Sequence, residues 1–219
     1  MIRLIAICFG LILAAPLLAQ EDAQVANKDS GNSATTDSTV DVSKEKIPSA
    51  FNGKDLTGWK VPENNVWWSA KDGELKVQSG PNKKGSTLWT EKEYTDFVID
   101  CEFKFGKGTV DSGFFMRNEH DQIQIGISGS LKRDMTGSPY IPGKGYPVEA
   151  KGVKELLKQT DWNAMRVVAK GNVYTVWLNG KQVMTYKSDS AVEKGPIGIQ
   201  LHGNRDMAID YRKIRIGEL

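Results

Sequence analysis

Hydrophobic and polar residues alternate along most of the chain after residue 47. The longest run lies at 97–105, where every second residue is apolar and Asp100, Glu102 and Lys104 occupy the positions between. A period of two places one set of side chains on each face of a β-strand. The same pattern recurs at 74–78, 122–127, 197–202 and 207–216. These segments are predicted to be strands with one face in a core.

Turn signals support an all-β domain. Residues 173–178 and 181–186 flank Asn179-Gly180, the strongest two-residue signal for a β-hairpin. Helical periodicity is nearly absent, and only residues 153–158 are expected to form a turn or two. Many short strands joined by turns indicate an antiparallel sandwich or a barrel, which spacing alone does not separate.

One long segment lacks a strand pattern. Residues 128–152 contain several glycines and prolines. A loop of this length in a compact domain is usually functional or disordered. We therefore expect it to form a wall of a binding site.

The first 19 residues have the pattern of a secretory signal peptide. Arg3 precedes the apolar run 4–15, and the small residue Ala19 stands at a cleavage position. A spanning helix needs about 20 apolar residues, and Pro16 interrupts this run. The sequence thus predicts export to the periplasm or the exterior, with no membrane association after cleavage. Residues 20–46 are predicted to be a disordered polar linker and 47–219 the folded domain.

The charge distribution limits the classes of partner that the protein can bind. The chain has 29 basic and 27 acidic residues, and the basic ones are scattered. Nucleic-acid binding requires a basic stripe with stacking aromatics, so no nucleic-acid partner is expected.

Cys8 falls in the leader, which leaves Cys101 as the only cysteine of the mature chain and excludes an intrachain disulfide. Its place in the alternation predicts a buried, inert thiol.

Several short motifs follow one another in a characteristic order. They are Phe-Asn-Gly-Lys-Asp-Leu-Thr-Gly-Trp at 51–59, Asp-Gly-Glu-Leu at 72–75, Asp-Ser-Gly-Phe-Phe-Met-Arg at 111–117 and Gly-Ile-Gln-Leu-His at 198–202. With them, residues 47–219 resemble the 3-keto-disaccharide hydrolase family. The resemblance implies a concanavalin A-like jelly roll, a two-sheet antiparallel β-sandwich with its sugar site on the concave sheet. It also implies secretion and cleavage of glycosides oxidised at carbon 3.

Two positions depart from the family pattern. Gln122 stands where the family has glutamate, and Asp111 where it has asparagine. An amide binds hydroxyls but takes no proton, which favours a non-catalytic, lectin-like carbohydrate-binding module as the alternative to an enzyme. The other outcome is that Asp111, Glu119 or Asp121 replaces the missing carboxylate. A structural surface protein, held on its polar tether, is a third interpretation.

The implied reaction sets requirements for the site. The ketone acidifies the hydrogen on the adjacent carbon, so a base can remove this hydrogen and the leaving group is expelled by elimination. The reaction needs a base whose pKa lies near neutral pH and hydrogen-bond donors that face the enolate oxygen. His202 is the favoured base, because imidazole titrates near neutrality and alternation directs it away from Ile199 and Leu201. Arg117 is the expected stabiliser of the enolate, or else a structural arginine paired with Asp111 or Glu119.

Three amides and a charged turn complete the candidates. Gln122, Gln124 and Gln200 are expected to bind hydroxyls. The turn 119–121 offers Glu119 or His120 as a functional member, and sequence does not rank Asp111, Glu119 and His120 against His202 as acid or base. Three consecutive residues seldom converge on a metal, so no cofactor is expected, although a divalent metal stays open.

Two further features favour structural roles. Asp100 and Glu102 lack the third acid of sandwich-fold glucanases, so we expect them on a solvated face. The tryptophans are expected mainly in the core, with one exposed indole able to stack on a sugar ring.

Overall fold

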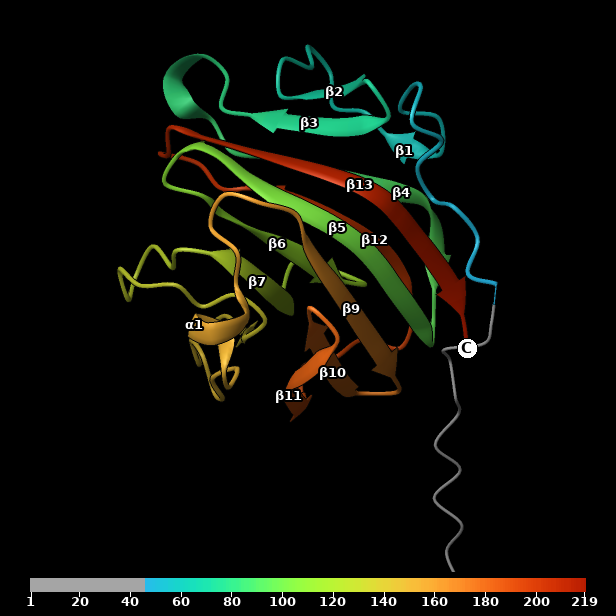
Figure 1. Ribbon diagram of the computed structural model, residues 1–219. Coiled ribbons are helices and arrows are strands. Elements are labelled where there is room, and N and C mark those ends of the chain that lie inside the picture. Colours follow the sequence, from blue (N-terminus) through green and yellow to red (C-terminus); the bar gives the residue numbers. More distant parts are fainter. Residues whose placement is uncertain (1–45) are drawn as a thin grey trace, which may run out of the picture. The chain divides into compact units, whose positions relative to one another are not determined.

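The computed structural model describes residues 46–219, which form two antiparallel β-sheets packed face to face (Figure 1). One sheet has the order β1-β4-β12-β6-β7-β8. Its strands are β1 (Trp59–Lys60), β4 (Ser86–Tyr94), β6 (Asp111–Met116), β7 (Gln122–Gly126), β8 (Pro139–Tyr140) and β12 (Gly195–Leu201). The two separate sheets confirm the sandwich and exclude the barrel.

The second sheet has the order β11-β10-β9-β5-β13-β3-β2. Its strands are β2 (Trp68–Lys71), β3 (Glu74–Gln78), β5 (Phe97–Gly108), β9 (Asn163–Lys170), β10 (Val173–Leu178), β11 (Lys181–Lys187) and β13 (Met207–Glu218). Figure 1 shows β13, β5 and β9 side by side, with β12 and β6 in the layer behind them. Strands distant in sequence are therefore neighbours in both layers.

The core follows the alternation read from the sequence. Phe97, Ile99 and Phe103 of β5 are fully buried, and Cys101 is 4% exposed among them. Burial in this apolar layer raises the pKa of the Cys101 thiol. A thiol that stays protonated is a poor nucleophile, so the cysteine acts as a small core residue.

The structure also has the hairpin turn that the sequence predicts. Asn179 and Gly180 both have positive φ, at 49° and 81°, and join β10 to β11 in the expected hairpin. A single helical turn, α1 (Val153–Leu156), lies within the predicted segment, and a short 3-10 helix spans Pro81–Lys83. The loop 128–152 differs from expectation in one respect, because it contains β8, which pairs with β7.

The carboxylates of β5 belong to the seven-stranded sheet and are paired. Asp100 accepts from Arg166 at 2.6 and 2.8 Å and from Arg215 at 3.2 Å. Glu102 accepts from Arg212 and Lys213. These acids thus form ion pairs on the outer face of that sheet rather than a glycosidase dyad.

The buried side chain of Arg117 links several loops through hydrogen bonds. Its side chain is 1% exposed, and its Nε donates to the carbonyl of Thr95 at 2.7 Å. Nη1 donates to the carbonyls of Gly171 and Val192 at 2.9 and 3.2 Å. Nη2 lies 3.6 Å from Asp96 Oδ1. The guanidinium is therefore committed to backbone carbonyls and Asp96, and neither Asp111 nor Glu119 pairs with it.

The predicted signal peptide and nearly all of the predicted linker lie outside the described residues. Within residues 46–219, no helix is long and apolar enough to cross a membrane.

Replacing Arg117 with alanine should lower the free energy of unfolding by about 3 kcal/mol, because three loop carbonyls lose the charged donor that the buried guanidinium supplies. Urea denaturation followed by tryptophan fluorescence measures this change. Arg133→Ala is the matched control, since Arg133 forms an exposed ion pair with Glu149, and it should unfold near the wild-type midpoint. Equal midpoints for both variants would contradict the structural role of Arg117.

Candidate functional site

Two adjoining cavities form a groove on the outer face of the six-stranded sheet. The larger, of about 620 Å³, contains Trp67 and Trp89 and is called here the tryptophan cavity. The smaller, of about 460 Å³, contains Tyr140 and Tyr146 and is called the tyrosine cavity. They share Gln200, His202 and Gly203, so β12 and the loop after it run beneath their junction.

Strand register brings residues from five strands into rows across the groove. Gln200 of β12 lies opposite Thr87 of β4 and Gly113 of β6, and Gly113 lies opposite Gln124 of β7. In the neighbouring row, the partners are Trp89, Gly198, Phe115, Gln122 and Tyr140. Side chains in such rows face one side of the sheet, which explains how short, separate motifs converge.

Gly198 makes room for an aromatic platform. A Cβ at this position would lie 2.7 Å from the Trp89 ring and 2.8 Å from Thr87 Cγ2. The indole lies against Phe115 at a centroid distance of 5.6 Å and an interplanar angle of 20°. The tryptophan expected in the core is thus partly exposed in the groove, where its ring can pack against the C–H face of a sugar.

Gly113 likewise leaves space for an amide side chain, that of Gln122. A Cβ there would lie 2.6 Å from Gln122 Nε2, so Gln122 can lean across it and donate to Gln200 Oε1 at 2.8 Å. Gln122 Nε2 also donates to the Ser112 carbonyl at 3.2 Å. Within residues 46–219, Gln122 Oε1 and Gln200 Nε2 have no hydrogen-bond partner. The pair therefore offers one acceptor and one donor to a hydroxylated ligand.

Asp111 is buried at the floor of the tyrosine cavity. It is 2% exposed, and its Oδ1 accepts from Gln124 Nε2 at 2.9 Å. Its Oδ2 accepts from Arg205 Nη2 at 3.3 Å. The carboxylate that stands in the family's asparagine position is consequently bound by an amide and a guanidinium.

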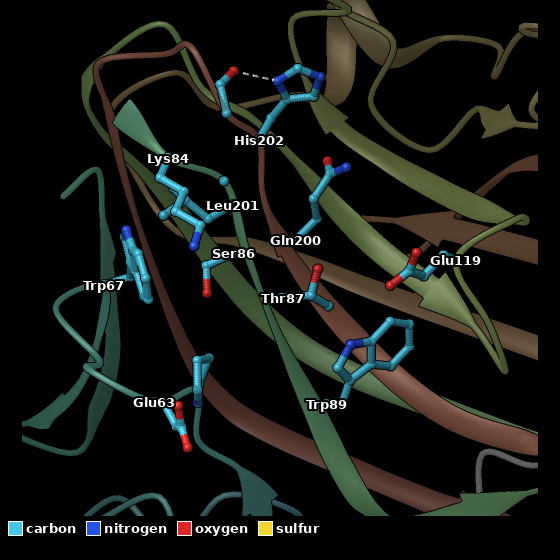
Figure 2. A pocket seen from close by; sticks show the side chains of 13 residues that line it. Glu63, Trp67, Lys84, Ser86, Thr87, Trp89, Glu119, Gln200, Leu201 and His202 are labelled. Atoms are coloured by element: carbon cyan, nitrogen blue, oxygen red, sulfur yellow. Dashed lines mark hydrogen bonds between the residues drawn. The ribbon is translucent and has the colours of Figure 1, made fainter. Parts of the chain in front are cut away.

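His202 lies at the junction of the two cavities and is exposed. Its Nδ1 is 2.6 Å from the carbonyl oxygen of Gly203. A carbonyl can only accept, so Nδ1 carries a proton, and in the neutral imidazole the lone pair is then on Nε2. Figure 2 shows the imidazole at one end of the tryptophan cavity, with Gln200 between it and the side chains of Trp89 and Glu119. The ring is therefore placed to accept a proton from a ligand in the groove.

The structure separates the predicted residues into two groups. The groove brings together His202, Asp111, Gln122, Gln124, Gln200 and Glu119. His120 is exposed in its turn and lines neither cavity. Arg117 is also outside the groove, in the buried position described above. Asp121 is fully buried, where it accepts from Tyr174 at 2.8 Å and from Ser190 at 2.6 Å.

Several groove residues were not among the sequence candidates. They are Lys84, Lys132, Tyr140, Tyr146 and Arg205. Lys132, Tyr140 and Tyr146 come from the loop 128–152, which was expected to form a wall of a site. Arg205 follows His202 in a polar loop, and this position three residues after a candidate base was the available signal.

The phenol of Tyr146 stays protonated. Burial raises its pKa to about 12, so the hydroxyl remains a neutral hydrogen-bond donor at physiological pH. In the described part of the chain, no three His, Cys, Asp or Glu side chains are grouped as a metal site.

A family model for the 3-keto-alpha-glucoside-1,2-lyase-like domain matches residues 47–217. The chain belongs to this family. Among curated proteins, none matches the chain. The match covers the whole sandwich and confirms the resemblance carried by the motifs.

Solved structures with the same fold include carbohydrate-active proteins. A Parabacteroides distasonis protein, provisionally described as a glycosyl hydrolase, is 27% identical with a TM-score of 0.60, covering 80% of this chain and 100% of its own. A second such protein from this organism is 22% identical with a TM-score of 0.60, covering 78% and 92%. The Emp47p carbohydrate recognition domain is 15% identical with a TM-score of 0.50, covering 78% and 93%. This family member is thus a carbohydrate-associated, glycoside-hydrolase-like sandwich.

The clearance at Gly198 gives a test of the groove geometry. Gly198→Ala should destabilise the domain by about 1–3 kcal/mol, because the new methyl group overlaps the Trp89 ring. The cost should be smaller in a Trp89→Ala background, where the contacts with the ring are removed and the contact with Thr87 remains. A double-mutant cycle in urea measures this coupling. Additive costs would show that the indole does not lie across Gly198.

Proposed function

We propose that this family member is an exported enzyme that cleaves 3-keto-glycosides by base-assisted elimination, with His202 as the base. The single observation that carries the proposal is the free Nε2 of His202 at the junction of the two cavities. The hydrogen bond from Nδ1 to Gly203 holds the ring in the tautomer that a base requires.

The reaction uses one base and one leaving group. His202 Nε2 takes the proton from carbon 2 of the sugar, and the electrons of that C–H bond form an enolate with the ketone at carbon 3. Collapse of the enolate forms the C1–C2 double bond and breaks the bond between C1 and the glycosidic oxygen. The departing oxygen takes a proton from solvent, and His202 returns its proton to solvent. Addition of water to this double bond would complete hydrolysis.

The groove supplies the remaining functions. Arg205 lines the same cavity as His202, and its guanidinium replaces Arg117 as the proposed electrostatic partner of the enolate oxygen. Gln122 and Gln200 present an acceptor and a donor to sugar hydroxyls. Trp89, stacked on Phe115, provides the apolar surface for one ring. The signal-peptide pattern predicted at 1–19 supports export.

The decisive assay uses 4-nitrophenyl 3-keto-α-glucoside and follows release of nitrophenol, with the unoxidised glucoside and an enzyme-free sample as controls. His202→Gln should lower kcat by about 100-fold or more, since a positioned general base contributes factors of this order. Running each sample with and without chelator also tests for a divalent metal.

Three results would separate the alternatives. Release from the keto substrate alone, lost in His202→Gln, supports the proposal. Undiminished release by His202→Gln would move the base to another residue, with Glu119 the next carboxylate in the groove. No release by folded wild-type protein would contradict catalysis.

A non-catalytic carbohydrate-binding module is the second candidate. Gln122 favours it, because its amide is bonded to Gln200 and cannot act as a base. Calorimetric binding of an unoxidised disaccharide, without turnover of any keto substrate, would support this alternative.

A further inference from the structure

The two cavities of the groove carry opposite charge. The tyrosine cavity contains two cations, Arg205 and Lys132, and one carboxylate, Asp111. The tryptophan cavity contains two carboxylates, Glu63 and Glu119, and one cation, Lys84. His202 lies where they meet. A ligand that spans the groove therefore meets a positive end and a negative end.

The single carboxylate of the tyrosine cavity does not balance both of its cations. Asp111 is shared between Gln124 and Arg205. Within the described residues, Arg205 Nε is buried without a hydrogen-bond partner, and Lys132 forms no ion pair. Incomplete compensation is costly for the largely buried Arg205, whose side chain is 21% exposed. Lys132 is exposed and adds an unpaired positive charge at the rim, so this end of the groove favours an additional anion.

Neutral groups beside these cations suit the same kind of ligand. Tyr140 and Tyr146 form a tilted aromatic pair with a centroid distance of 5.3 Å, and Tyr146 keeps its hydroxyl proton. Ser128 and Ser130 line the same wall. Guanidinium, ammonium and hydroxyl donors together bind the oxygens of a carboxylate or sulfate ester.

We propose that the tyrosine cavity is a subsite for an acidic sugar, one that carries an oxyanion such as a carboxylate or a sulfate ester. The proposal rests on the groove being the carbohydrate site of the proposed function, and it names the substrate class of that site. The carboxylates Glu63 and Glu119 repel an acidic ring from the opposite cavity, so charge also sets the direction in which the ligand lies across His202.

The test compares matched ligands by calorimetry on the purified protein. Methyl α-glucoside is the neutral probe, methyl α-glucuronide the carboxylate probe, and methyl α-glucoside 6-sulfate the sulfate probe. At low salt, at least one acidic probe should bind about tenfold more tightly than the neutral probe, as expected for one charge-assisted contact. The preference should shrink at about 0.5 M salt, where exposed charges are screened.

Variants locate the effect. Lys132→Glu should reduce the acidic preference to near one and leave the affinity for the neutral probe little changed, and Arg205→Gln should also reduce the preference. Lys151→Glu makes the same charge change in the same loop but lines neither cavity, so it should keep the preference. Equal binding of all three probes, or an equal loss in Lys151→Glu, would overturn the proposal.

Failure of this inference and failure of the proposed function give different results. A wild-type protein that cleaves the keto substrate but binds all three probes equally would refute only the acidic subsite. A protein that binds an acidic probe selectively and cleaves no keto substrate would refute only the elimination. Comparison of the two acidic probes identifies the carboxylate or the sulfate ester as the preferred oxyanion.

Discussion

The antiparallel pairing of β12 with β4 and β6 is the constraint on which the groove depends. It places Gly198 between Trp89 and Phe115, and Gln200 between Thr87 and Gly113. A one-residue slip of β12 would turn Ile199 and Leu201 into the groove and bury Gln200. The buried face of β12 prevents that slip, so the core of the sandwich also fixes the register of the site.

The two arginines illustrate how burial divides structural from functional roles. Arg117 has a positive φ of 68° at the end of β6, and its guanidinium donates hydrogen bonds to loop carbonyls. Arg205 retains a buried Nε without a partner among the described residues and faces a cavity. Arg117 also has one buried nitrogen without a partner among these residues, Nη2, so position separates the two roles: Arg117 lines neither cavity of the groove, whereas Arg205 lines the tyrosine cavity. The candidate role therefore moves from Arg117 to Arg205.

The two sheets differ in how they use charge. Acids on the outer face of the seven-stranded sheet, such as Asp100 and Glu102, are bound by arginines and lysine. The six-stranded sheet instead presents amide and aromatic side chains to the groove, with His202 directly after β12. Since a sandwich supports many unrelated activities, this difference between its faces says more about function than the fold does.

The sequence by itself determined the fold class, most of the strands, the 173–186 hairpin, the buried Cys101 and the family. These features depend on local periodicity, turn chemistry and ordered motifs, all of which are visible along one chain. The same alternation placed Gln122, Gln124, Gln200 and His202 on polar strand faces, but it did not say that these faces belong to one groove.

Only the tertiary structure decided which residues meet. Gly113 and Gly198 matter because side chains from neighbouring strands lie across them, and cross-strand register is not encoded in the spacing of either strand. The burial of Arg117 and the entry of Arg205, Tyr140 and Tyr146 into the groove depend on how loops far apart in sequence pack together. Periodicity assigns a side chain to a face, whereas packing between distant segments decides whether that face is solvent, core or site.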